Sequence, residues 1–187
     1  MIYYIMGKSA SGKDTLYKRL LDAKLDLRTI PIYTTRPKRD GEMEGHEYHF
    51  VDERYIEDNA SKVIEKRVYD TVFGPWIYAT IDDGSIVDEH NYLMIGTLES
   101  YVAVRDYYGK DKVYPIYMEV DDEIRRERAL KREREQKTPK YDEMERRFKA
   151  DKIDFSEEKI NAAGIVKRYN ANDFDRCVAE IIQDIQK

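Results

Sequence analysis

Residues 7–15 read Gly-Lys-Ser-Ala-Ser-Gly-Lys-Asp-Thr, and this stretch decides the fold. An apolar segment, residues 2–6, precedes it, and leucines at helical spacing, Leu16 and Leu20, follow it. The order is therefore a strand, a glycine-containing loop and a helix. In that order a G-x-x-x-x-G-K match predicts a loop that binds phosphate, whereas a lone glycine-rich turn with an exposed lysine would need no such neighbours.

The residue types in this stretch suit a phosphate group. Gly7 and Gly12 allow tight backbone turns, so that several N–H groups point at one spot. The first turn of the following helix adds the positive end of its dipole. Lys13 supplies a mobile cation for the outer phosphates of a nucleotide.

Composition narrows the class of protein. The chain has 187 residues, which fits one domain, and its net charge of −5 argues against a broad nucleic-acid surface. The one cysteine, Cys177, lies in an apolar helical pattern and indicates a reducing compartment, and the three histidines show no zinc-ligand spacing with it. Met1 leads directly into a strand, and no apolar run is long enough to span a membrane. We expect a cytoplasmic protein that binds neither nucleic acid nor membrane.

Strand-like and helix-like segments alternate along the chain, which predicts an α/β domain with a mainly parallel sheet. The expected strands are residues 2–6, 28–33, 92–95, 113–120 and 164–169. The expected helices are residues 15–24, 98–108, a highly charged region from 121 to 155, and 173–186. Residues 34–90 are too long for a plain loop and suggest an inserted subdomain. The expected single domain, 1–187, thus has a core of residues 1–33 and 91–187.

A second motif lies at residues 34–51, Thr-Thr-Arg-Pro-Lys-Arg-Asp-Gly-Glu-Met-Glu-Gly-His-Glu-Tyr-His-Phe-Val. Arg36, Arg39 and Tyr48 in this run would make a good clamp for a phosphate dianion, because arginine pairs with phosphate through two hydrogen bonds. A charged surface hairpin would not explain why the run begins with Thr-Thr-Arg or contains Gly41 and Gly45. Two phosphate sites in one chain are what a nucleoside-monophosphate kinase needs.

The second motif resembles the signature of the guanylate kinase family, and the phosphate loop resembles that of the same family. Residues 72–74, Val-Phe-Gly, and 78–80, Tyr-Ala-Thr, look like its tyrosine-glycine-serine/threonine element. Residues 64–65, Ile-Glu, are similar to the glutamate segment before that element. The resemblance covers nearly the whole chain and is strongest in residues 1–80.

The resemblance implies a P-loop NTPase fold. It has three layers, a parallel five-stranded sheet, a small β-rich insertion at 34–90 that binds the monophosphate, and a helical lid at about 126–150. It also implies transfer of a phosphoryl group from ATP to GMP with Mg²⁺ as cofactor, by a monomer or a homodimer.

The resemblance assigns six residues to GMP. The residues that would hold its phosphate are Arg36, Arg39, Tyr48 and Tyr78. The residues that would read its base are Glu65 and Thr80. Chemistry supports the assignment of Glu65, because a carboxylate accepts from both N1–H and N2–H₂ of guanine, whereas adenine presents an acceptor at N1. The alternative for Glu65 is a surface helix acid, since Lys66 and Arg67 follow it.

The resemblance also assigns the ATP side. The loop residues expected to bind ATP are Gly7, Ser9, Ala10, Ser11, Gly12, Lys13, Asp14 and Thr15. The spacing of Arg128 and Arg132 resembles the lid entrance, and the run 144–148 resembles its far side. Lys13, Arg132 and Arg147 are the expected catalytic residues, with Arg146 as the close alternative, and most other charges of the region are expected to be a solvated helix face.

The sequence departs from the family pattern at three places. Asp14 follows the loop lysine, where the family has serine or glycine; with Thr15 it is a candidate Mg²⁺ ligand, or else a first-turn acid that favours the helix dipole. Met94 and Gly96 stand where the family has two aspartates. Ile32 stands where it often has a serine near the base.

Two other functions fit the same resemblance. One is a ribose-1,5-bisphosphate kinase-like enzyme, which would not need Glu65 as a base reader. The other is a non-catalytic guanylate-kinase-like binding module, which typically loses the phosphate loop or the lid arginines. This chain keeps Lys13, Arg132 and Arg147.

Overall fold

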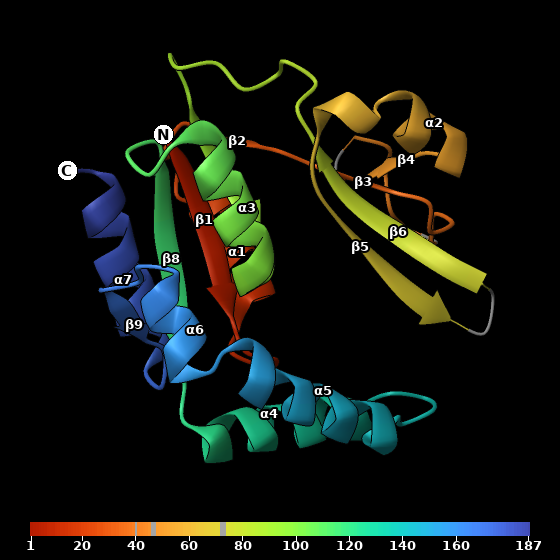
Figure 1. Cartoon of the computed structure of the whole chain (residues 1–187). Coiled ribbons are helices and arrows are strands. Elements are labelled where there is room, and N and C mark those ends of the chain that lie inside the picture. The colour runs from red at the N-terminus through yellow and green to blue at the C-terminus, as the bar shows by residue number, and fades with distance from the viewer. Residues whose placement is uncertain (40, 46–47, 72–73) are drawn as a thin grey trace.

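The computed structural model describes residues 1–39, 41–45, 48–71 and 74–187. A five-stranded parallel sheet in the order β2-β7-β1-β8-β9 lies at its centre (Figure 1). Its strands are β1 (Ile2–Gly7), β2 (Leu27–Thr29), β7 (Asn91–Ile95), β8 (Val113–Glu119) and β9 (Arg168–Asn170). The predicted parallel five-stranded sheet is confirmed.

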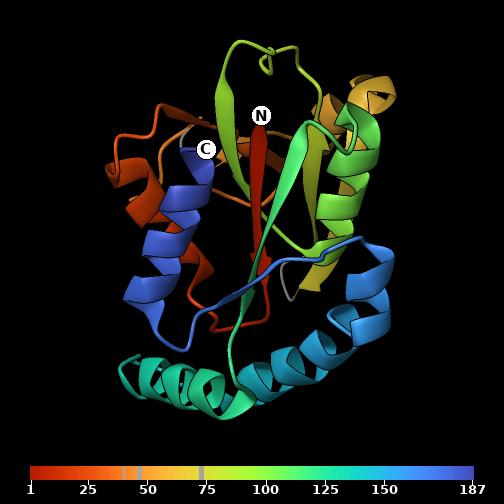
Figure 2. The same cartoon turned by 90° about the vertical axis from the view of Figure 1, so that its left-hand side faces the viewer.

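Helices cover both faces of this sheet, as Figure 2 shows. They are α1 (Lys13–Asp22) and α7 (Phe174–Ile185) on one face, and α3 (Leu98–Tyr108) and α6 (Glu157–Ala162) on the other. The alternation of β1 explains the arrangement, because successive side chains of a strand point to opposite faces. Tyr3 and Ile5 pack with α1 and α7, whereas Tyr4 and Met6 pack with α3.

A second sheet, in the order β4-β3-β6-β5, stands beside the first (Figure 1). It contains β3 (Ile32–Thr34), β4 (Tyr48–Phe50), β5 (Val63–Thr71) and β6 (Gly74–Ile81), with α2 (Glu53–Asp58) and a 3-10 helix (Ala60–Lys62) in the connection. It is mixed, since β3 pairs parallel with β4 but antiparallel with β6. Ile56 of α2 packs under it against Tyr33, Ala79 and Ile81.

The single strand predicted at 28–33 is wrong. The segment forms two strands, β2 in the first sheet and β3 in the second, with Pro31 between them. Proline has no N–H to continue a ladder, so the chain leaves one sheet and enters the other at this point. The second sheet therefore begins at Ile32, inside the range that the sequence assigned to the core.

The charged region after β8 forms two helices, α4 (Asp122–Arg134) and α5 (Tyr141–Asp154), which lie together at one end of the sheet (Figure 1). Ala129, Met144 and Phe148 form the small apolar contact between them. The strand predicted at 164–169 is shorter and later, because Ile165 packs into the core without pairing and β9 starts at Arg168. No helix in the described part of the chain has the length and apolar character that crossing a membrane requires.

Candidate active site

The phosphate loop joins β1 to α1, and both of its glycines are required by close contacts. A Cβ on Gly7 would lie 2.7 Å from the carbonyl oxygen of Met118 on β8. Gly12 has φ +98°, and a Cβ there would lie 3.1 Å from the ring of Phe174. A larger residue at position 7 would therefore clash with the backbone of β8, and one at position 12 would be strained by the positive φ and crowd the Phe174 ring.

The loop places the Lys13 ammonium under its own backbone. Nζ donates to the carbonyl oxygens of Gly7, at 2.7 Å, and Lys8, at 3.1 Å. Burial lowers the pKa of Lys13, and the positive charges of Arg125 and Arg132 lower it further, against an opposing effect of nearby acids. Arg132, predicted from sequence, is exposed on α4, the helix that Arg125 joins to this loop.

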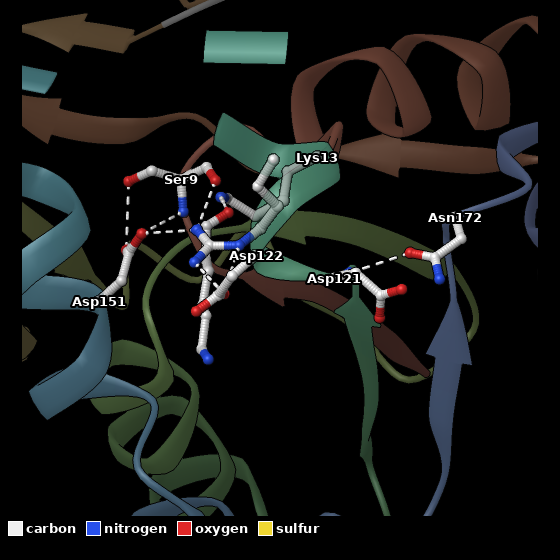
Figure 3. A network of polar contacts seen from close by, with 8 residues as sticks. Ser9, Lys13, Asp121, Asp122, Asp151 and Asn172 are labelled. Carbon is white, nitrogen blue, oxygen red and sulfur yellow. Dashed lines mark hydrogen bonds and ion pairs between the residues drawn. The ribbon is translucent and has the colours of Figure 1, made fainter. Parts of the chain in front are cut away.

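A buried arginine that the sequence did not single out ties the loop to the two charged helices. Figure 3 shows Ser9 of the loop beside Asp122 of α4 and Asp151 of α5. Arg125 of α4 is 1 % exposed and donates to the Ser9 carbonyl at 2.8 Å and to Asp151 Oδ2 at 2.9 Å. It also donates to Asp122 Oδ1 at 2.6 Å. Asp151 of α5 accepts from the Ser9 N–H at 2.9 Å and from the Ser9 hydroxyl at 3.1 Å. No sequence signal separates Arg125 from the surrounding arginines, because only its burial distinguishes it.

Three further residues, Ser11, Asp14 and Thr15, have side-chain oxygen atoms near the start of α1. Ser11 is buried, and its hydroxyl lacks a hydrogen-bond partner within the described part of the chain. Asp14 and Thr15 are exposed on the first turn. Their carboxylate and hydroxyl oxygens are of the type that Mg²⁺ prefers. Since the described ranges hold no group of three potential ligands, a metal here would take most of its ligands from phosphates and water.

Just after β3 of the second sheet, Arg36 forms the centre of the predicted phosphate clamp. It is 3 % exposed, and its guanidinium donates to Glu42 Oε1 at 2.7 Å and lies 5.2 Å above the Tyr48 ring. The Tyr78 ring meets the Tyr48 ring edge-on at 5.7 Å. Arg39 is exposed, and its backbone N–H donates to the other oxygen of Glu42 at 2.8 Å. The structure thus brings the four predicted phosphate residues to one region and adds Glu42.

The predicted base readers, Glu65 on β5 and Thr80 on β6, are register neighbours. The Thr80 hydroxyl donates to Glu65 Oε1 at 2.9 Å, and the Glu65 side chain is 10 % exposed. The alternative of a surface helix acid is therefore wrong, because the residue lies on a strand with its carboxylate turned inward. Arg67 also reaches Glu65, through Nε to Oε2 at 3.2 Å and Nη2 to Oε1 at 3.4 Å.

The pKa values of Tyr48 and Arg146 are both affected by charged or titratable groups on other segments of the candidate site. Burial is the main reason why the pKa of Tyr48 is raised, and the charge of Asp14 in the phosphate loop adds to it. Glu143 raises the pKa of Arg146, and Tyr69 of β5 adds to that effect. Arg146 and Arg147 both donate to Glu143, at 2.7 and 3.0 Å. One carboxylate of α5 therefore pairs with both candidate arginines.

The three departures have structural consequences. Met94 is buried in the core beneath α3, and Ile32 packs against the same cluster. A Cβ on Gly96 would lie 2.2 Å from the hydroxyl of Tyr4, so that hydroxyl fills the space at this position. Burial raises the pKa of Tyr4, and the Glu65 carboxylate raises it further while Arg67 lowers it. Val72 and Phe73, which carry part of the family resemblance, and His46 lie outside the described residues.

The comparisons with known proteins agree with this geometry. The family model described as guanylate kinase matches residues 2–82. A guanylate kinase of Chromobacterium violaceum is 33% identical over 89 residues, covering 44% of this chain and 42% of that protein. One of Neisseria gonorrhoeae is 39% identical over 83 residues, covering 44% and 40%. The chain thus spans about two fifths of the length of these curated relatives.

The fold agrees over a greater length. The crystal structure of guanylate kinase from Anaplasma phagocytophilum superposes with a TM-score of 0.67, covering 100% of this chain and 84% of that one at 18% identity. At that identity the likeness concerns the fold alone. Residues 2–82 therefore match the guanylate kinase family in sequence, and the solved structure extends the likeness in fold to the whole chain.

Proposed function

We propose that the protein is a nucleoside-monophosphate kinase that transfers the γ-phosphoryl group of ATP to GMP. The observation that carries the proposal is that one chain holds both a glycine-shaped phosphate loop with a bonded lysine and a separate cluster of Arg36, Tyr48 and Tyr78. An oxygen of the GMP phosphate would attack the γ-phosphorus. The bond from that phosphorus to the bridging oxygen would break, and ADP and GDP would leave.

On the ATP side, residues 7–15 would hold the triphosphate, and Lys13 would bind its outer oxygens. Arg132 and Arg147 would neutralise the charge that develops on the transferred group. Arg132 lies on α4, the helix that Arg125 joins to the loop. Arg125 is a positioning residue, since it is buried and holds the loop backbone in place.

A divalent metal, which we propose to be Mg²⁺, would enter with ATP. Asp14 and Thr15 would hold it or its water shell, and it would offset the negative charge of the β- and γ-phosphates. The Asp14 carboxylate would otherwise repel the triphosphate.

On the acceptor side, Arg36, Arg39, Tyr48 and Tyr78 would hold the phosphate of GMP. Glu65 and Thr80 would read its base. The inward-facing carboxylate of Glu65 favours GMP over ribose 1,5-bisphosphate, which has no base. The glycine-shaped loop and its bound lysine favour an enzyme over a non-catalytic binding module.

We further propose that the chain acts as one domain, as a monomer or homodimer. The insertion at 34–90 and the lid at about 126–150 would close over the two nucleotides and exclude water.

A panel assay tests the proposal. Purified protein with ATP and Mg²⁺ is offered GMP, dGMP, AMP, CMP, UMP, IMP and ribose 1,5-bisphosphate, and formation of ADP is measured. We expect the highest kcat/KM with GMP. Preference for ribose 1,5-bisphosphate, or no turnover of any acceptor, would contradict the proposal.

A further inference from the structure

Arg67 lies where the acceptor base would bind, although no signature in the sequence marks it. Its register partner on β6 is Tyr78, one of the clamp residues, and its guanidinium is bonded to Glu65. The side chain is 19 % exposed, so it points inward with Glu65 rather than into solvent. Two candidate acceptor-site residues are therefore its direct neighbours.

The guanidinium has donors to spare. Arginine carries five N–H groups. Two of them bond Glu65. Within the described part of the chain the other three have no hydrogen-bond partner. The pair therefore presents free donors next to the oxygens of a carboxylate.

This pattern is complementary to one edge of guanine. Guanine shows an acceptor, O6, beside two donors, N1–H and N2–H₂, so a donor beside two acceptors matches it. Adenine reverses the first two groups, because N6 is a donor and N1 an acceptor. A buried site that pairs all three groups discriminates strongly against a base that leaves one unpaired.

The acceptor site also needs a donor for O6. Ile32 supplies no hydrogen bond, and Gly96 has no side chain. The Tyr4 hydroxyl fills the space beside Gly96, and the charges of both Glu65 and Arg67 act on it. Arg67 is a positively charged donor beside Glu65 and Tyr4.

We propose that Arg67 is a specificity-determining residue that donates to O6 of the acceptor guanine while Glu65 accepts from N1–H and N2–H₂. The inference rests on the proposed function and deepens it, since it restricts the acceptor to bases with an oxygen at position 6. Among the purine monophosphates the expected order is GMP, then IMP, which lacks the 2-amino group, then AMP.

A cycle of enzyme and substrate changes separates this role from a merely structural one. The kcat/KM of GMP and of 6-thio-GMP, whose sulfur is a poor acceptor, is measured for the wild type and for Arg67→Met. If Arg67 binds O6, we expect thio substitution to cost the wild type about tenfold and the variant nearly nothing. If Arg67 only orients Glu65, both enzymes lose the same factor, and the proposal is overturned.

Two controls keep the test decisive. Lys66→Met changes the exposed neighbour on the same strand and should keep the wild-type response to thio substitution. If Arg67→Met fails to fold, the single variant Glu65→Gln is compared with the double variant Glu65→Gln/Arg67→Met, which leaves no unpaired charge. In that comparison, only the single variant should lose kcat/KM when GMP is replaced by 6-thio-GMP. A wild type that phosphorylates ribose 1,5-bisphosphate and no nucleotide would instead defeat the proposed function, and this inference with it.

Discussion

Lys13 of the phosphate loop and the arginines of the proposed acceptor side are held in different ways. Lys13 is bonded to two neutral carbonyl oxygens, whereas Arg36 is paired with Glu42 and Arg67 with Glu65. Neutral partners leave the full charge of the ammonium for an incoming phosphate. Carboxylate partners compete with an anionic ligand, but they fix a planar guanidinium in direction. This difference indicates that Lys13 is placed to bind charge, whereas Arg36 and Arg67 are placed to bind in a fixed direction.

The largest expected effect is that of Lys13→Ala. If the ammonium stabilises charge that develops on the outer phosphates, kcat/KM should fall by about 10²–10³-fold. The melting temperature should change little, because the lysine bonds only its own loop. Lys18→Ala, an exposed lysine on the same helix, is the control. Near-normal turnover of Lys13→Ala would show that the comparison is wrong on the ATP side.

The next effect is on stability, through Asp151→Ala. This change removes a carboxylate from Arg125, which is nearly inaccessible to water, and we expect a loss of about 3 kcal/mol in the free energy of unfolding. Denaturant titration measures it. Asp154→Ala, three residues later and 61% exposed, should cost little. Equal losses in the two variants would mean that the buried network does not hold the loop.

The lid arginines give a smaller and sharper test. Arg147→Met should lower kcat by about 10²-fold with KM nearly unchanged, as expected for a group that acts mainly in the transition state. Arg146→Met is the matched control, because it shares Glu143 as its partner. The reverse result would assign the catalytic role to Arg146.

The smallest effect concerns pH. The hydrogen bond from Arg146, with that from Arg147, lowers the pKa of Glu143 to about 2. The stabilisation from this lowered pKa is present above the ordinary glutamate pKa and disappears as the pH falls through about 2. Glu143→Gln should therefore be less stable than the wild type at pH 6, with the gap closing near pH 2. A gap that does not depend on pH would exclude this ion pair as its origin.

Sequence reasoning succeeded where local patterns decide the structure. The strand, loop and helix of residues 2–22 follow from apolar runs, glycines and the lysine, all within one stretch of chain. The same holds for α7, whose apolar face includes Cys177, and burial there raises the pKa of the thiol to about 11. These elements need no distant partner to be recognised.

It failed where distant segments decide the structure. Pro31 divides one apolar run between two sheets, and only the pairing partners show this. Arg125 and Asp151 meet across 26 residues, and the Tyr4 hydroxyl reaches Gly96 from another strand. In the sequence, Arg67 after Glu65 favoured an exposed surface helix. In the structure both residues lie on β5, two positions apart, and therefore point to the same, inward face.

The identity of the acceptor is the central claim, and the ratio of GMP to AMP turnover in two variants tests it most directly. Glu65→Gln should lower that ratio by about 10-fold or more, since an amide cannot accept from both guanine donors. Arg39→Ala should slow both substrates and leave the ratio unchanged, because Arg39 is proposed to bind the phosphate and not the base. If Glu65→Gln also leaves the ratio unchanged, the guanine assignment is wrong, and ribose 1,5-bisphosphate is the acceptor to test first.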